Sequence, residues 1–176
     1  MITAISIRAA VPSDAPRLSA LGREVFIDTY SGTASAHDIQ RHVDDYFGES
    51  TISYDLGQAS VQYLLAIDDE SCAGLVKLRE GDTPTLVSAA NAIEVQQLYV
   101  STDFQRMGIG RRLMDSAVAT AQERGSAGIW LSVWTEADWA TKFYLDYGFI
   151  SLGEIPFMLG DTEYVDYLMW LPFDGS

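Results

Sequence analysis

The fold of this chain is decided by residues 98–112, which read LYVSTDFQRMGIGRR. An apolar strand ends near residue 100, a tight turn follows, and Gly108 and Gly110 open an amphipathic helix over 108–124. Glycines let backbone N–H groups approach a ligand closely, and the N-terminal end of a helix attracts anions. The same short stretch holds three of the eleven basic residues of the chain, Arg106, Arg111 and Arg112. It therefore predicts a strand–turn–helix unit that binds a phosphate-rich ligand.

On both sides of this unit, segments with the apolar spacing of strands alternate with segments that have the spacing of helices. Helices are expected after the break at 12–14, after the cap residue Ser35, and over 108–124 and 137–147; 80–91 reads as a loop. Strands are expected at 2–8, 61–67, 72–78, 93–100, 129–133, 149–152 and 164–170. Antiparallel hairpins toward the ends and a β-α-β unit in the middle predict a mixed, mostly antiparallel α/β sheet of about seven strands, with helices on both faces.

Composition limits the class of protein. The 176 residues, 48% of them apolar, suffice for a single domain over 1–176 with its own core. A net charge of 11 − 25 = −14 argues against nucleic acid or anionic lipid as a partner. Cys72 is the single cysteine, which excludes a disulfide framework and a cysteine-built zinc site. Neither a membrane span nor a basic leader is evident, so we expect a cytoplasmic protein with Cys72 reduced.

Two signatures together resemble a known family. The turn lacks the Gly-Lys-Ser/Thr of a nucleotide P-loop and the third glycine of the dinucleotide fingerprint. Residues 105–110 match Gln/Arg-x-x-Gly-x-Gly/Ala, the signature of the GNAT N-acetyltransferase superfamily. Residues 133–149 resemble its second signature, in which a strand precedes Asn-x-x-Ala-x-x-Phe-Tyr and Gly-Phe, although Ala137 stands at the Asn position. The chain thus resembles GNAT enzymes over most of its length.

The resemblance implies acetyl-CoA as the acetyl donor, with no metal. Backbone amides of the turn would hold its pyrophosphate, and backbone groups of the preceding strand would pair with its pantetheine arm, as if the cofactor were an extra strand. Loss of the family Asn at Ala137 either weakens this binding or is compensated by Glu136 or Asp138. Lys142 either reaches the 3′-phosphate or is an ordinary exposed lysine. The expected cofactor-binding residues are Leu98, Val100, Gln105, Arg106, Met107, Gly108, Ile109, Gly110, Arg111, Arg112 and Lys142.

Two side chains are expected to act in catalysis. Tyr144 matches the family tyrosine that protonates the departing thiolate; alternatively it packs beside Phe143. Glu94 resembles the carboxylate that several relatives use as a general base, often through a water that Gln96 could orient. It lies four residues before Leu98, so strand alternation places both on one face. Alternatively, Glu94 is a solvated residue at the strand end.

The acceptor is less well defined by the sequence. Residues 26–30 and 157–169 loosely resemble bacterial polyamine acetyltransferases. His37 and His42 lie in a region that forms a wall of the acceptor site in relatives. We nevertheless expect a surface or capping role for both. The acceptor is therefore expected to be a cationic primary amine of small size, because the first two helices carry excess negative charge. The acidic residues are Glu24, Asp28, Asp38, Asp44 and Asp45. Acetylation of a protein N-terminus or lysine, a non-catalytic CoA-binding regulator, and a homodimer remain open alternatives.

Overall fold

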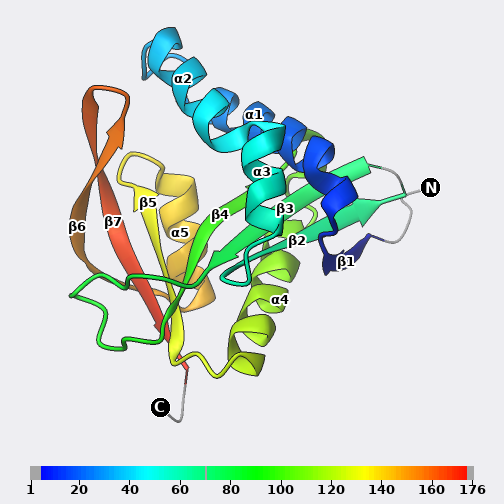
Figure 1. Ribbon diagram of the computed structural model, residues 1–176. Coiled ribbons are helices and arrows are strands. Elements are labelled where there is room, and N and C mark those ends of the chain that lie inside the picture. The colour runs from blue at the N-terminus through cyan, green and yellow to red at the C-terminus, as the bar shows by residue number, and fades with distance from the viewer. Residues whose placement is uncertain (1–4, 70, 174–176) are drawn as a thin grey trace.

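The structure is a computed structural model that describes residues 5–69 and 71–173. These residues form a seven-stranded sheet in the order β1-β2-β3-β4-β5-β7-β6 (Figure 1). The strands are β1 (Ser6–Ala9), β2 (Val61–Asp68), β3 (Ser71–Arg79), β4 (Ile93–Val100), β5 (Gly128–Trp134), β6 (Ile150–Leu159) and β7 (Thr162–Pro172). Neighbours are antiparallel except β4 and β5, which are parallel. The predicted mixed, mostly antiparallel sheet is confirmed; the part of the first expected strand over residues 1–4 lies outside the described residues.

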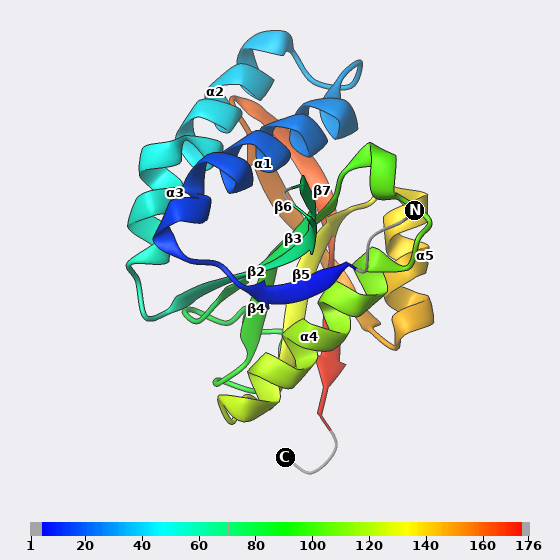
Figure 2. The same ribbon diagram turned by 90° about the vertical axis from the view of Figure 1, so that its right-hand side faces the viewer.

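Helices cover both faces of the sheet, as expected. One face carries α1 (Ala15–Tyr30), α2 (Ala36–Phe47) and α3 (Glu49–Leu56), and the other carries α4 (Ile109–Glu123) and α5 (Asp138–Tyr147) (Figures 1 and 2). Short 3-10 turns at Pro12–Asp14 and Thr102–Phe104 precede α1 and α4. Apolar side chains fill both interfaces, so the sheet packs between two helical layers.

Local interactions explain where several elements begin and end. The Ser35 hydroxyl accepts the Asp38 N–H at 3.1 Å, which is the predicted cap of α2. Asp14 does not cap α1 with its side chain, because that carboxylate accepts two hydrogen bonds from Arg8 and one from the Val11 N–H. Helix α3 was not expected: its eight residues bury only Ile52, which leaves little periodicity to detect.

The β6–β7 hairpin is longer than its sequence pattern indicates. Pro156 falls between the strands expected at 149–152 and 164–170, in what would be a turn, but it lies within β6 opposite Val165. Because β6 is the edge strand of the sheet, a residue without an N–H group is tolerated there. The hairpin consequently extends well beyond the predicted strand and ends at residues 160–161.

The sheet opens between its two parallel strands. Only Ile93 pairs with Ile129 and Glu94 with Trp130, at the start of β4 and β5. The rest of β4, residues 95–100, remains paired with β3 except at Gln96, but has no partner on the β5 side. The two strands therefore diverge toward their carboxyl ends, and this opening positions the candidate site.

Candidate active site

The turn before α4 presents a row of backbone donors. Gly108 has a φ of 76° and Arg106 a φ of 63°, so two left-handed residues in close succession bend the chain sharply. The first helical hydrogen bond runs from the Arg112 N–H to the Gly108 carbonyl, at 3.1 Å. Within the described residues, the N–H groups of 106–111 have no backbone acceptor, as the geometry of a helix start requires. This arrangement can bind a pyrophosphate.

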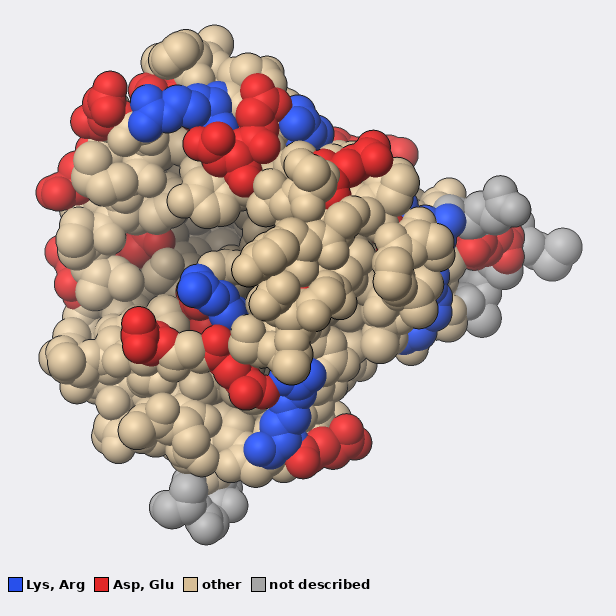
Figure 3. Space-filling model, viewed as in Figure 1, with Lys and Arg blue, Asp and Glu red and all other residues tan. Residues whose placement is uncertain are grey.

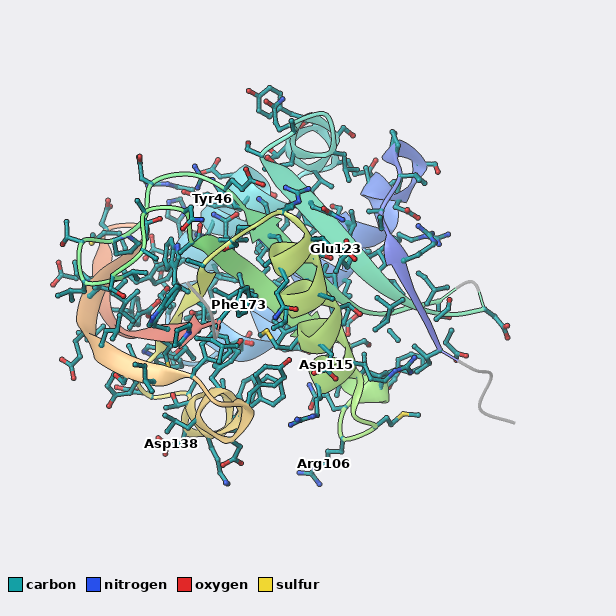
Figure 4. The ribbon with its side chains drawn as sticks, turned by 90° about the horizontal axis from the view of Figure 1, so that it is seen from below. Tyr46, Arg106, Asp115, Glu123, Asp138 and Phe173 are labelled. Carbon is teal, nitrogen blue, oxygen red and sulfur yellow. The ribbon has the colours of Figure 1, made fainter. Side chains whose placement is uncertain are left out.

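The three arginines of the turn have different surroundings. Arg106 lies at the tip and points away from the fold (Figure 4). The Arg111 guanidinium lies over the Tyr147 ring of α5, 5.2 Å from its centroid. Arg112 instead donates to the Ile5 carbonyl at 2.7 Å, and its own N–H is bonded within the helix. The backbone N–H of Arg112 is therefore used inside the helix, and a contribution of its exposed side chain to the phosphate site, through the guanidinium donors that Ile5 leaves free, stays a prediction.

Helix α5 lies beside the N-terminal end of α4 (Figures 2 and 4). On α5, Lys142 pairs with Asp146 at 2.7 Å, and both side chains are exposed, so a ligand phosphate would have only a weak surface pair to displace. Ala137 is buried just before α5 and provides no side-chain cap. Glu136 and Asp138, the suggested substitutes for the family Asn, are exposed on either side of it.

Tyr144 is half-buried on α5 and contacts two aromatic rings, Phe143 at 5.2 Å and Phe149 at 5.6 Å between centroids. Burial raises the pKa of its hydroxyl. Within the described residues this hydroxyl has no hydrogen-bond partner, so it is free to donate to a ligand. Across the opening, burial raises the pKa of Tyr99 on β4, and the nearby Tyr30 and Tyr144 raise it further. The phenols of Tyr30 on α1 and Tyr144 on α5 thus both lie near that of Tyr99 on β4.

Glu94 does not share a face with Leu98. Gln97 is opposite Lys77, but Val95 is opposite Leu78, so Gln96 is an extra residue that forms a β-bulge. The bulge reverses the alternation, and the side chain of Leu98 packs with that of Val95 toward α4. Glu94 points to the face covered by α1, α2 and α3. The predicted common face is therefore wrong.

The surroundings of Glu94 suit a proton acceptor. Its carboxyl lines a cavity of about 240 Å³ together with Arg79, Gly81, Asp82 and Trp130. Burial raises the pKa of this carboxyl, while the charges of Arg79 and Lys77 lower it. The carboxyl of Glu94 therefore gains and loses its proton at a pH closer to neutrality than the carboxyl of an exposed glutamate does. Glu94 is thus partly buried near the start of β4, and its role as a base stays a prediction.

Aromatic rings line the opening on the face of the sheet that α1, α2 and α3 cover, which is called the acceptor face because the acceptor is expected there. The rings of Tyr30 and Trp134 lie 5.5 Å apart and those of Trp134 and Tyr164 6.1 Å apart, which joins α1, β5 and β7. Figure 3 shows this face hollowed between the helices at the top and the hairpin and loop below them. Acidic and basic side chains alternate over those helices, and Asp44 pairs with Arg23 at 2.9 Å. The negative charge expected over the first two helices is therefore partly neutralised by basic side chains.

The two histidines differ. His37 is exposed, as expected, whereas His42 stacks between Phe26 and Tyr46, with both centroid distances at 4.3 Å. Burial lowers the pKa of His42 to about 4. The expected surface or capping role of His42 is corrected: it is a neutral member of an aromatic stack.

Sequence reasoning missed Asp166. This residue of β7 is only 6% exposed and accepts a hydrogen bond from the Ser132 hydroxyl at 2.8 Å. Its other oxygen, Oδ1, is buried without a partner in the described residues. Alternation along β7 puts Asp166 on the same face as Leu168. A charged residue in line with buried apolar ones is the signal by which the sequence could have revealed it.

Comparison with known proteins agrees with this geometry. The family model described as the acetyltransferase (GNAT) family matches residues 24–149, which include both the turn and Tyr144. The chain belongs to the GNAT family. The predicted family and enzyme class, an N-acetyltransferase, are confirmed. A curated GNAT relative, an "uncharacterized N-acetyltransferase in pepI 3′ region" of Lactobacillus delbrueckii subsp. lactis, is 28% identical over 96% of this chain and 97% of its own.

Solved GNAT structures share the fold. The PaiA N-acetyltransferase of Thermoplasma acidophilum, in complex with coenzyme A, superposes with a TM-score of 0.80 at 21% identity, covering 97% of this chain and 100% of that one. The ribosomal-protein-S18-alanine N-acetyltransferase of Escherichia coli superposes with a TM-score of 0.69 at 17% identity, covering 98% and 96%.

Two further features were searched for over residues 5–69 and 71–173. These residues contain no group of three or more His, Cys, Asp or Glu side chains arranged to hold a metal ion. Within the same ranges, no helix is both long and apolar enough to span a membrane. Cys72 is a free, half-buried thiol whose pKa burial raises to about 11, so it is unsuited to act as a nucleophile.

Proposed function

We propose that this GNAT domain, residues 1–176, transfers an acetyl group from acetyl-CoA to a primary amine of a small cationic molecule, by direct attack in a ternary complex. The observation that carries the proposal is the opening between β4 and β5. A turn with free amides and Tyr144 flank it on one face. Aromatic rings line the other face, and Glu94 lies on that face at the paired end of the two strands. A donor and an acceptor can therefore meet from opposite sides of the sheet.

The donor side fits acetyl-CoA. Six free N–H groups at residues 106–111 match the demands of a pyrophosphate, with help from the exposed arginines. The unpartnered edge of β4, which includes Leu98 and Val100, offers backbone donors and acceptors to the two amides of the pantetheine arm. The complex of PaiA with coenzyme A, which has this fold, supports the same donor.

The chemistry then needs three groups. The attacking amine must lose a proton, and Glu94 accepts it, directly or through water. The tetrahedral oxyanion needs a donor, and the Leu98 N–H supplies it at the edge of the opening. The departing thiolate needs a proton or a strong donor, and the free phenol of Tyr144 provides this. Because burial raises the pKa of Tyr144, the phenol stays protonated over the working pH range.

The test is release of free thiol from acetyl-CoA in the presence of a matched amine panel. The panel contains an alkylamine, a diamine, a peptide with a free N-terminus and a peptide with an internal lysine. We expect release with the small amines and mass-spectrometric detection of the acetylated product. Turnover confined to the peptides would replace the small-molecule acceptor by a protein, and coenzyme A binding without turnover on any amine would indicate a regulator.

A further inference from the structure

The acceptor face holds a buried ion pair that the proposed chemistry does not use. The Lys77 ammonium of β3 lies 2.6 Å from the Asp55 carboxylate of α3, and these side chains are only 9% and 16% exposed. The same oxygen of Asp55 accepts a hydrogen bond from the Tyr63 hydroxyl at 3.1 Å. The Lys77 ammonium also lies 5.4 Å from the centre of the Tyr63 ring. These contacts fix the ammonium in one place against α3.

Such a buried ion pair adds little net stability, because the cost of removing both charges from water offsets most of their attraction. Apolar side chains of similar volume often fill such a position at least as well. What an apolar pair does not provide is the electric field of an ammonium inside the protein. Lys77 is therefore a candidate to act on another titratable group of the same face.

Glu94 is a titratable group of that face. Leu75 packs with residues of α1 and α3, so alternation along β3 puts Lys77 and Arg79 on the same side as those helices. Arg79 is directly opposite Glu94 in the β3–β4 register, so the three charged side chains neighbour one another on two adjacent strands. Burial raises the pKa of the Glu94 carboxyl, and the charges of Arg79 and Lys77 lower it.

The charges around Glu94 differ in how strongly solvent screens them. Arg79 is exposed, and so is Asp82, which shares the Glu94 cavity and has the opposite sign. Water and salt weaken the effect of both on Glu94, and Trp130 of β5 lines the cavity without a charge. The Lys77 ammonium is buried, so its field is screened much less. Of the two cations of β3, Lys77 is therefore the one whose effect persists in salt.

We propose that Lys77, held in place by Asp55, is a positioning residue for Glu94: its buried ammonium keeps that carboxyl ionised, and so able to accept a proton, at physiological pH and salt. The inference rests on the proposed function, because that function assigns the base to Glu94. With burial alone, the carboxyl would stay protonated to higher pH and could not accept the proton of the amine near neutrality. Lys77 acts only through Glu94 and takes no part in bond making.

The experiment follows the Glu94 carboxyl directly, by carbon-13 NMR titration of the full chain, with its signal assigned by its absence in Glu94→Gln. Lys77→Met should raise the midpoint of this titration by at least about half a pH unit, whereas Lys77→Arg, which keeps the charge, should stay near native. The double variant Lys77→Met/Asp55→Asn should show the same rise without leaving an unpaired carboxylate in the interior. Arg41→Met, at an exposed cation of α2, is the matched control and should leave the midpoint unchanged.

Salt distinguishes the two cations of β3. In about 1 M sodium chloride the effect of Arg79→Met on the midpoint should shrink, whereas the effect of Lys77→Met should persist. A merely structural ion pair would lower the melting temperature without moving the midpoint. An unchanged midpoint in both Lys77→Met and the double variant therefore overturns the proposal, and so does an effect of Lys77→Met that disappears in salt.

The acid limb of kcat/KM against pH is the second readout, and it separates this inference from the proposed function. We expect that limb to move upward together with the NMR midpoint. If the midpoint moves and the limb does not, Glu94 is not the base and the proposed function fails at that step, while control of the Glu94 charge by Lys77 stands. If no amine is acetylated, the proposed function fails as a whole, and the NMR midpoints alone decide about Lys77.

Discussion

Glu94 and Leu98 lie four residues apart on β4, yet their side chains point to opposite faces of the sheet because Gln96 bulges between them. The bulge therefore separates two tasks on one strand. Leu98 anchors β4 in the core beneath α4 while its backbone remains at the open edge. Glu94 lines the cavity on the other face, where we propose that it accepts the proton of the incoming amine.

Replacement of this carboxylate should change the pH profile. Glu94→Gln should lower kcat/KM at neutral pH and recover part of it near pH 9 to 10, because more of the amine is then already neutral. In the native protein, activity should rise with pH through the pKa of Glu94, which burial places above that of an exposed glutamate. Profiles of kcat/KM against pH with one amine measure this. Asp82→Asn, in the same cavity, is the control, and parallel profiles for native protein and Glu94→Gln would exclude Glu94 as the base.

Removal of one hydroxyl from α5 should affect turnover. Tyr144→Phe should lower kcat roughly 10²-fold, with coenzyme A affinity nearly unchanged, since the phenol acts on the departing thiolate. The matched control is Tyr147→Phe on the same helix, whose hydroxyl donates to Asp115 at 2.7 Å. Steady-state kinetics and calorimetry check both variants. Equal kcat values for Tyr144→Phe and native protein would assign the proton donor to another group.

The phosphate-binding turn can be tested with two nearly isosteric substitutions. A saturating concentration of acetyl-CoA, about 100 times Kd, should stabilise the native protein by about 2.7 kcal/mol. Gly108→Asp places a negative charge among the free amides and should abolish this gain, whereas Gly108→Asn should retain most of it. Both variants carry the same strain at the positive φ of Gly108, so charge is the remaining difference. Thermal shifts measure the effect, and an equal shift in both variants would move the anion site elsewhere.

The aromatic stack around His42 should make stability depend on pH. Its pKa is about 4 in the folded protein and about 6.5 when unfolded, so the unfolded state binds more protons between these values. The stability that neutral His42 contributes is complete above about pH 6.5 and is lost as pH falls through about 4. His42→Phe keeps a ring between Phe26 and Tyr46 and should flatten this part of the curve, while His37→Gln should not. Denaturant midpoints at several pH values measure the stability of each variant. If the pH dependence of stability is unchanged in His42→Phe, it comes from carboxylates instead.

Some elements could be predicted because their signals are local. The helix over 109–123 shows a buried stripe, glycines at its start and a left-handed Gly125 at its end. The eight-residue α3 lacked such a stripe because it buries a single side chain. The extension of β6 through Pro156 depends on that strand being at the edge of the sheet, which only the tertiary arrangement decides.

The candidate site also has parts that the sequence predicts and parts that it does not. The turn at 105–111 and Tyr144 carry motifs, and the structure places them beside the opening. The bulge at Gln96 carries no sequence signal, so simple alternation assigned Glu94 to the wrong face. The occupation of Arg112 by the Ile5 carbonyl is a contact between residues far apart in sequence. Asp166 was overlooked because alternation shows which face a side chain is on, but not that this side chain is buried and bonded to Ser132.

The two-pair contact between β4 and β5 also bears on how the chain unfolds. With so few interstrand hydrogen bonds across it, the seam divides the sheet into β1–β4 and β5–β7, which α4 and α5 hold together mainly through side-chain packing. Local opening follows the weakest hydrogen-bonded boundary, so amides along this seam should exchange with deuterium sooner than those inside either half. A ligand that hydrogen-bonds along both strands would join the halves into one cooperative unit, and the acetyl donor would then act as a missing structural element of the protein as well as its substrate.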